Sequence, residues 1–178
     1  MDIYSLIEQR QSDRKYDSNR KVEAEKIQRI VEAARLAPSA CNSQPWHMIV
    51  VDDSEKCREV TDAVVSLGMN GFAVDVPVHI VIVEEAPNFT ARLGGWVKNK
   101  HFPNIDCGIL ASHITLAATA EGLGSCILGW FDQKKMRKSL GIPSSKRVIL
   151  DIVIGYSTDN HRNKARKPIE KVISHNKY

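Results

Sequence analysis

The sequence is poor in the features that mark membrane, secreted and metal-binding proteins. Its 178 residues contain no apolar run near the roughly 18 residues that a transmembrane helix needs. The first fifteen residues include an early acidic residue and lack the apolar core of a signal peptide. The four cysteines form no C-x-x-C pair, and no histidine stands at a zinc-like spacing from another ligand. We therefore expect a cytoplasmic protein with reduced thiols, no metal site and no membrane partner.

In other respects the composition is that of an ordinary globular chain. Hydrophobic residues make up 43% and charged residues 26% of the sequence, so disorder is not expected. The length suffices for one hydrophobic core, and there is no internal repeat, linker or low-complexity tract. The G-x-G-x-x-G fingerprint of a separate Rossmann nucleotide-binding domain is also missing. We expect a single domain over residues 1–178.

Positive charge is concentrated near the two ends of the chain. Residues 10–21 and 162–171 together carry ten basic and three acidic side chains, although the whole chain has a net charge of only +4. Neither stretch has the interleaved aromatic residues or the known motifs of nucleic-acid-binding proteins, so we expect no nucleic-acid partner. A small anionic ligand such as a phosphate fits this localised charge, because a guanidinium group donates paired, charge-assisted hydrogen bonds. Two solvated basic surfaces are the alternative explanation.

Hydrophobic periodicity predicts helices and strands that are mixed along the whole chain. Apolar residues at helical spacing predict helices over residues 3–9, 22–36, 53–67, 105–121 and 133–140. Short β-branched runs predict strands over residues 47–51, 76–83, 125–130 and 147–154. This pattern predicts an α+β or α/β arrangement of helices on one central sheet.

Two details of this assignment concern the middle of the chain. Residues 84–104 are expected to be irregular, because Pro87, the pair Gly94–Gly95 and Pro103 act as breakers. Asp106 is expected at the start of the long helix that follows, where the helix macrodipole favours a carboxylate.

The segment Ala37–Trp46, APSACNSQPW, is the most unusual motif in the sequence. It follows a helix that Pro38 ends, and it leads into a strand. The side chains of Asn42 and Gln44 carry both donors and acceptors, which suits recognition of a heterocycle edge such as the flavin pyrimidine. On residue chemistry alone, an Asx-rich turn between helix and strand is the simpler explanation.

Four motifs in order give the chain a wider resemblance. They are RQSDR at residues 10–14, APSACNSQPW, GLGSCILGWF at residues 122–131, and Lys164-x-Arg166 after a strand that ends in Ile-Gly-Tyr. In this order and spacing, from about residue 5 to residue 172, the chain resembles the nitroreductase family. The resemblance implies an α+β fold with a central mixed β-sheet flanked by helices. It also implies a homodimer that binds FMN at the dimer interface.

The resemblance further implies which residues bind the cofactor. The phosphate and the edge of the ring would be bound by Arg10, Ser12, Arg14, Lys164 and Arg166. The strand end beside the ring would comprise Ile127, Leu128, Gly129 and Trp130, with Asn70 supplying an amide. The middle motif would reach the flavin held mainly by the partner subunit through Pro38, Ser39, Ala40, Asn42 and Gln44. The residues expected to line a substrate pocket are Trp96, His101 and Phe102.

The chain departs from the family pattern at two positions of the early motif. Gln11 stands where a second consecutive arginine is frequent, and Asp13 replaces a usual apolar residue. These departures leave the predicted phosphate ligands in place, but they change the contacts around them.

The function implied by the resemblance is an FMN-dependent oxidoreductase. NAD(P)H would reduce the flavin, and an electron-poor nitroaromatic, quinone or enone would then take the hydride in a ping-pong cycle. No catalytic side chain is expected, since the N5 atom of the flavin carries the chemistry. One alternative is a specialised enzyme on the same scaffold, a reductive dehalogenase or a flavin-cleaving enzyme. The other is a non-catalytic flavin-binding protein.

Overall fold

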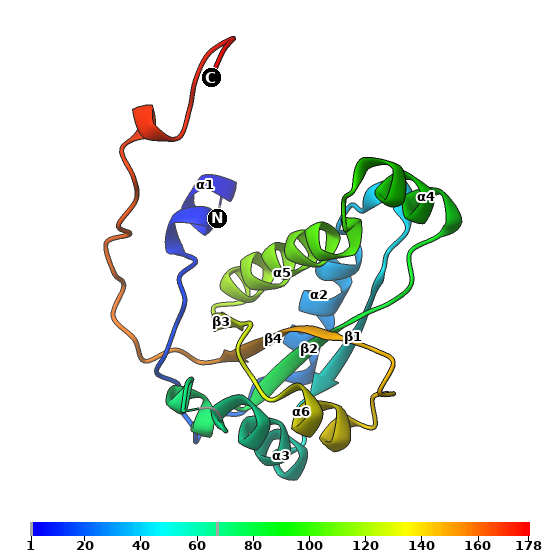
Figure 1. The fold of residues 1–178 in the computed structure, drawn as a ribbon. Helices are drawn as coiled ribbons and strands as arrows, with labels where there is room; N and C mark the ends of the chain where they lie inside the picture. The colour runs from blue at the N-terminus through cyan, green and yellow to red at the C-terminus, as the bar shows by residue number, and fades with distance from the viewer. Residues whose placement is uncertain (1, 67) are drawn as a thin grey trace.

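Four strands form one sheet at the centre of the molecule. In the computed structural model, which describes residues 2–66 and 68–178, the strand order is β1-β2-β4-β3 and the four strands pair antiparallel. Their bounds are β1 Trp46–Val51, β2 Val78–Glu84, β3 Gly124–Leu128 and β4 Val148–Gly155 (Figure 1). An isolated parallel bridge joins Ser12 to Ser125 of β3, so both senses of pairing occur. This bridge ties the N-terminal segment to the edge of the sheet.

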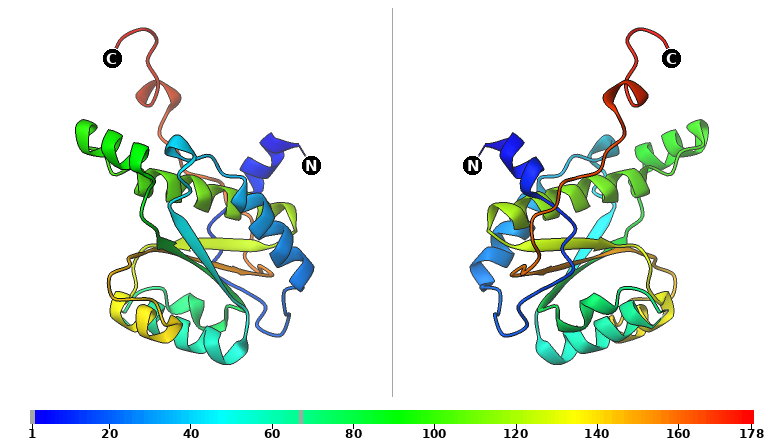
Figure 2. Two further views of the ribbon diagram at one scale, coloured as in Figure 1. Left: turned by 90° about the vertical axis from the view of Figure 1, so that its right-hand side faces the viewer. Right: turned by 90° about the vertical axis from the view of Figure 1, so that its left-hand side faces the viewer.

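Helices cover both faces of this sheet. α2 (Ala24–Arg35) and α5 (Phe102–Ala120) lie on one face, whereas α3 (Ser54–Val65) and α6 (Gln133–Leu140) lie on the other (Figures 1 and 2). Successive residues of a strand point to opposite faces. Ile80 and Ile152 therefore pack with α2 and α5, and Val81 and Val153 pack with α3 and α6. The predicted central sheet flanked by helices is confirmed.

The two ends of the chain run side by side outside these layers. α1 (Ile3–Gln9) begins at Asp2, whose carboxylate caps the first turn, and it buries no residue. The C-terminal stretch after β4 is extended and mostly exposed, apart from the short 3-10 helix η3 (Ile169–Lys171). A hydrogen bond of 2.8 Å from Lys164 Nζ to the carbonyl oxygen of Ile7 joins the two ends. Within residues 2–66 and 68–178, no helix has the combined length and hydropathy of a membrane span.

The prediction that residues 84–104 are irregular was wrong, because α4 (Phe89–Lys98) forms inside this stretch. Its first turn is capped by Asn88, whose side-chain oxygen accepts from the backbone N–H of Ala91 at 2.9 Å. Gly94 and Gly95 lie inside the helix, where glycine is normally unfavourable. A Cβ atom on Gly95 would lie 2.7 Å from the carbonyl oxygen of Lys100. This glycine therefore permits a close approach of the following turn and does not break the helix.

A chain of polar side chains crosses the core between the sheet and α3. His79 Nδ1 lies 2.8 Å from Asp151 Oδ2, and His79 Nε2 lies 3.2 Å from Thr61 Oγ1. Both His79 and Asp151 are fully buried, and buried polar groups are costly unless they are paired. The three side chains therefore link β2, β4 and α3, and loss of any one of them leaves a buried polar group without its partner.

We expect Asp151→Ala to lower the free energy of unfolding by about 3–5 kcal/mol, because it leaves His79 buried without its partner. Urea unfolding followed by circular dichroism measures this change. Asp62→Ala, on the exposed side of α3, is the matched control and should shift stability by no more than about 0.5 kcal/mol. Equal effects of the two substitutions would contradict the structural role of the buried pair.

Candidate functional site

The two basic ends of the chain converge on one pocket. The backbone N–H of Arg162 donates to Gln11 Oε1 at 3.0 Å, and Lys164 Nζ also donates to the carbonyl oxygen of Glu8. A cavity of about 320 Å³ lies between the two segments. Five basic residues and no carboxylate line it, the full set being Arg10, Gln11, Ser12, Arg14, Arg162, Asn163, Lys164 and Arg166. The structure thus brings together the residues that were predicted separately at positions 10–14 and 164–166.

The gathered cations influence one another. Partial burial, and then the positive charges of Arg10 and Arg166, lower the pKa of Lys164. Asp159 Oδ2 lies 3.9 Å from Arg162 Nη1 and offsets one of the charges from outside the lining. Because like charges at close range repel, the cluster favours occupation by an anion that carries more than one negative charge.

Asp13 organises the backbone beneath this pocket. Its carboxylate is 5% exposed, and it accepts from Gln11 Nε2 at 2.9 Å, from Ser157 Oγ at 2.8 Å and from the N–H of Ser125 at 3.2 Å. A Cβ atom on Gly124 would lie 2.8 Å from Asp13 Oδ2, so glycine is required there for this close approach. The two departures from the family pattern, Gln11 and Asp13, therefore bind each other and anchor the basic segment to β3.

A second group of predicted residues meets at the C-terminal end of β3. Asn70 Nδ2 donates to the carbonyl oxygen of Trp130 at 2.8 Å. Asn70 has a φ of 57° and precedes the 3-10 helix η2 (Gly71–Asp75). The guanidinium carbon of Arg14 lies 5.8 Å from the ring centroid of Phe72 in η2, which connects the basic pocket to this strand end. We call the basic pocket together with Asn70 and residues 127–130 the basic half-site.

The segment Pro38–Gln44 lies at the N-terminal end of α5. It contains the 3-10 helix η1 (Ala40–Asn42). Asn88 holds it against α4 by donating from its N–H to Ser43 Oγ at 2.7 Å and from Nδ2 to the carbonyl oxygen of Cys41 at 3.0 Å. Three non-glycine residues of the segment have a left-handed backbone, a conformation that the surrounding structure must stabilise; they are Cys41, Asn42 and Gln44.

Asp106 does not have the helix-terminal position that the sequence suggested. α5 begins at Phe102 and accommodates Pro103 in its first turn, so Asp106 lies in the second turn. Asp106 is 3% exposed, and its Oδ1 atom accepts from the N–H of Ala40 at 3.1 Å. The carboxylate therefore positions the backbone of η1.

The three predicted substrate-pocket residues line one cavity between α4 and the start of α5. This cavity has a volume of about 480 Å³, and Trp96, His101 and Phe102 all border it. Because Asn88 both caps α4 and binds the preceding motif, the cavity and the segment Pro38–Gln44 form one structural unit. We call this unit the loop half-site.

The basic pocket and the loop half-site lie at opposite ends of α5. Figure 2 shows α1, next to the basic segment, at one end of α5 and α4 at the other. Within the described part of the chain, no hydrogen bond joins residues 38–44 to residues 10–14 or 162–166. One chain therefore keeps the segment Pro38–Gln44 apart from the basic pocket.

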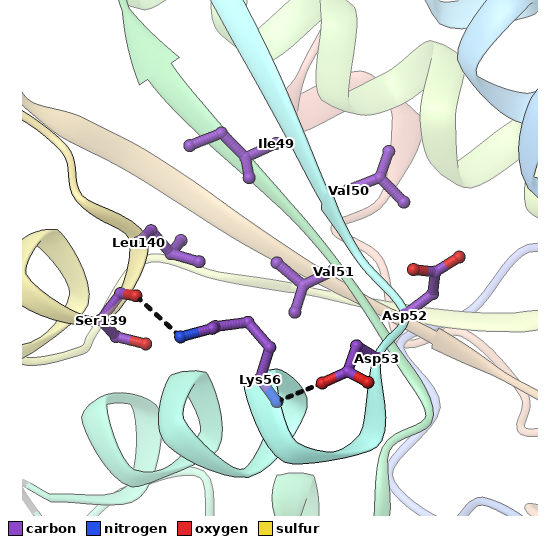
Figure 3. Close-up of a pocket in the computed structure, with 8 residues that line it drawn as sticks. All are labelled: Ile49, Val50, Val51, Asp52, Asp53, Lys56, Ser139 and Leu140. Atoms are coloured by element: carbon purple, nitrogen blue, oxygen red, sulfur yellow. Dashed lines mark hydrogen bonds between the residues drawn. The ribbon is translucent and has the colours of Figure 1, made fainter.

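A smaller cavity of about 220 Å³ lies at the open edge of β1 and involves none of the predicted site residues. Figure 3 shows Ile49, Val50 and Val51 of β1 beside Lys56, whose Nζ atom donates to the carbonyl oxygen of Ser139 at 3.3 Å. Its only ammonium group is already bound to the protein, so we assign no ligand to it.

The family model described as the Nitroreductase family matches residues 7–68 and 65–156. The chain belongs to the nitroreductase family. A protein of Archaeoglobus fulgidus, provisionally named NADH dehydrogenase/NAD(P)H nitroreductase, is 34% identical over 158 residues, which are 86% of this chain and 84% of that protein. An enone reductase of conjugated linoleic acid (CLA) biosynthesis from Lactiplantibacillus plantarum is 27% identical over 184 residues, with 86% of this chain and 85% of that protein covered.

A solved structure extends this similarity to the fold. An FMN-dependent nitroreductase from Clostridium difficile has a TM-score of 0.77 and 31% identity to this chain, and the match covers 99% of this chain and 100% of that one. The nitroreductase fold expected from the order of the motifs is confirmed.

Sequence reasoning missed several residues of the two half-sites. Arg162 and Asn163 line the basic pocket. Arg162 belongs to the basic stretch at residues 162–171, so the charge pattern contained a signal for it. Asn88 joins η1 to α4. An asparagine just before a helix is a common N-cap, and this was the signal for it in the sequence. Arg92 and Lys100 line the cavity of the loop half-site, but they become neighbours only through the turn after α4.

We expect Asp106→Ala to release the backbone of η1, because it removes a charge-assisted hydrogen bond worth about 1.5–3 kcal/mol. The rate of amide hydrogen exchange at Ala40, measured by NMR or mass spectrometry, should rise at least several-fold. Asn104→Ala, an exposed position on the first turn of the same helix, is the control and should leave that rate unchanged. An unchanged exchange rate in Asp106→Ala would show that the carboxylate does not hold this segment.

Proposed function

We propose that the protein is an FMN-dependent oxidoreductase that takes electrons from NAD(P)H and passes them to electron-poor acceptors. The observation that carries this proposal is the basic pocket, in which five cations and no carboxylate surround a cavity of about 320 Å³. A phosphate dianion fits such a lining because guanidinium and ammonium groups donate charge-assisted hydrogen bonds to it. Membership of the nitroreductase family and the similarity to an FMN-dependent nitroreductase support the same cofactor.

The residues of the basic half-site divide the binding of this cofactor between them. We assign the phosphate and the ring edge to the cations and hydroxyl of the pocket, namely Arg10, Ser12, Arg14, Lys164 and Arg166. The strand end would hold the isoalloxazine ring, and Asn70 fixes this strand end by its hydrogen bond to Trp130. The residues concerned are Ile127, Leu128, Gly129 and Trp130. When bound, FMN supplies hydride transfer at its N5 atom. A cation of the early motif at the ring edge favours negative charge there.

The loop half-site then serves the flavin of a second copy of the chain. A symmetric homodimer can place the residues Pro38, Ser39, Ala40, Asn42 and Gln44 of one subunit beside the basic half-site of the other. Exposed apolar side chains on α1, α4 and the C-terminal stretch support such an association; they are Ile3, Tyr4, Ile7, Phe89, Trp96, Val97, Ile169, Val172 and Ile173. In that assembly the cavity lined by Trp96, His101 and Phe102 belongs to the shared active site.

Donor and acceptor use this site in turn in the proposed ping-pong cycle. The acceptor is an electron-poor small molecule such as a nitroaromatic, a quinone or an enone, and the similarity to an enone reductase supports the last class. The protein excludes water and orients the acceptor, and it needs no nucleophilic side chain of its own. All four cysteines are free thiols, which fits the cytoplasmic location that we also propose.

The purified protein is expected to be yellow and to oxidise NADH or NADPH with menadione or a nitrofuran as acceptor. Arg10→Ala and Arg166→Ala should each weaken FMN binding by about tenfold, because each leaves phosphate charge without a hydrogen-bond donor. Titration of the flavin-free protein by FMN fluorescence measures the affinity. Arg35→Ala, exposed on α2 and paired with Glu32, is the control and should retain full affinity.

Three outcomes would contradict this assignment. Unchanged FMN affinity in both basic variants would refute the phosphate site. A protein that binds no FMN would refute the cofactor. Bound FMN without turnover of any acceptor would refute the oxidoreductase assignment and indicate a flavin-binding protein.

The shared site predicts complementation between differently damaged subunits. One subunit carries Arg10→Ala with Arg166→Ala, and the other carries Asn42→Ala with Gln44→Ala. Heterodimers isolated through two affinity tags should regain about half of the wild-type turnover, because one of the two symmetric sites is then intact. Each parent homodimer has two damaged sites and should be impaired.

The reciprocal arrangement is the control for this experiment. A heterodimer of a wild-type subunit with a subunit that carries all four substitutions has one damaged half in each shared site, and it should be as impaired as the parents. Half activity in this heterodimer, together with no recovery in the first, would show that each chain completes its own site.

A further inference from the structure

The cavity of the loop half-site carries positive charge that hydride transfer to a neutral acceptor does not require. Arg92, Lys100 and His101 contribute to its lining together with the aromatic side chains of Trp96 and Phe102, and no carboxylate does. Its volume of about 480 Å³ falls within the roughly 300–1,000 Å³ of small-molecule sites. The rest of the lining is largely apolar and aromatic, which suits a ring system, and the cations add a means of binding an anionic group.

Nearby acidic residues do not neutralise all of this charge. Glu84 Oε1 lies 2.8 Å from His101 Nε2, and Glu84 Oε2 lies 3.5 Å from Arg147 Nη1. Glu85 is paired with Lys146. Glu84 therefore offsets the charge of His101 when the imidazole is protonated. Arg92 and Lys100 form no ion pair with any residue that the structure describes.

The turn between α4 and α5 holds Lys100 in a defined position. Asn99 has a left-handed backbone with φ of 50°. Its N–H donates to the carbonyl oxygen of Trp96 at 3.3 Å, and the N–H of Lys100 donates to that of Gly95 at 2.8 Å. These two bonds form a Schellman motif, which closes the end of a helix. A Cβ atom on Gly95 would also lie 3.5 Å from Phe102 Cδ2, so the same glycine brings the turn and the aromatic ring together.

We propose that this cavity selects substrates in which a ring system is joined to an anionic group. Arg92 and Lys100 bind the anion, and Trp96 and Phe102 contact the ring, since aromatic faces favour stacked or edge-on neighbours. This specificity rests on the function proposed above and adds the class of substrate to it. The anion is either a carboxylate on the electron-poor acceptor or the 2′-phosphate of NADPH, because both present oxygen atoms to the same cations.

The test compares substrates that differ in charge but not in shape, with the FMN-loaded enzyme. The ratio of kcat/KM for 4-nitrobenzoate to that for neutral 4-nitrobenzamide is measured with NADH as the donor. Arg92→Gln and Lys100→Gln should each lower this ratio by about two- to fivefold, as expected for one partly exposed charge pair, and the double variant should lower it further. The concentration of active enzyme cancels in the ratio, so partial loss of folded protein does not affect it.

Lys98→Gln is the matched control, because Lys98 is an exposed cation in the last turn of the same helix and does not line the cavity. It should leave the ratio unchanged. Binding is followed separately by the quenching of tryptophan fluorescence with 4-nitrobenzoate. The quenching that disappears in Trp96→Phe comes from ligand bound in this cavity. In the double variant, the 4-nitrobenzoate concentration that gives half of this quenching should be higher.

A second experiment compares kcat/KM for NADPH with kcat/KM for NADH at a fixed concentration of 4-nitrobenzamide. A fall in the NADPH-to-NADH ratio of kcat/KM in the double variant, without a change in the acceptor ratio, identifies the phosphate of the donor as the bound anion. If neither ratio changes and the fluorescence titration is unaltered, the proposed specificity is wrong. Turnover of the neutral acceptor separates that outcome from a failure of the oxidoreductase assignment, which would abolish turnover of every acceptor.

Discussion

Both half-sites depend on the burial of α5 against the sheet. The helix contributes Leu110, Ile114 and further small and apolar residues to the core that it forms with α2, β2 and β4, and burial of this surface is its main stabilisation. Its N-terminal end carries Asp106, which holds η1. Its C-terminal end is fixed to α2 by the ion pair between Arg29 and Glu121, 2.7 Å apart. A helix anchored in this way sets the distance between the loop half-site and the basic pocket.

The basic half-site combines a repulsive cluster of cations with strong anchoring of the backbone that carries it. Five basic residues around one cavity oppose folding unless the segment is held by other contacts. Asp13 supplies these contacts through the three hydrogen bonds that its buried carboxylate accepts, and Gln11 links the N-terminal segment to the tail. The residues that depart from the family pattern thus allow the cations proposed to bind the phosphate to stay close together before any anion is bound.

Much of the fold could be predicted from the sequence, because the strands and the helices α2, α3, α5 and α6 bury surfaces whose periodicity is local. Charge counting also located both sides of the basic pocket, since each side is a continuous stretch of chain. Two positions were assigned wrongly from the sequence, because their roles depend on contacts that form only in the folded chain. Gly95 was expected to break any helix, but its lack of a side chain allows the backbone of Lys100 to lie close to it. Asp106 indicated a helix terminus, but its partner is Ala40, sixty-six positions away in the chain. The partner of Asp106 cannot be identified from residues close in sequence, and the approach of Lys100 to Gly95 depends on how the chain turns after α4.

The geometry of α5 also explains why a second chain is needed for the proposed active site. The helix has 19 residues, so at 1.5 Å per residue it separates its ends by about 28 Å. An arginine or glutamine side chain spans only a fraction of that distance, and the core packing of α5 leaves no room for the helix to shorten. Rotation of side chains therefore cannot join the loop half-site to the basic pocket within one chain. A two-fold axis can do so, because it places the end of one helix beside the opposite end of its copy, and assembly then becomes a condition for catalysis.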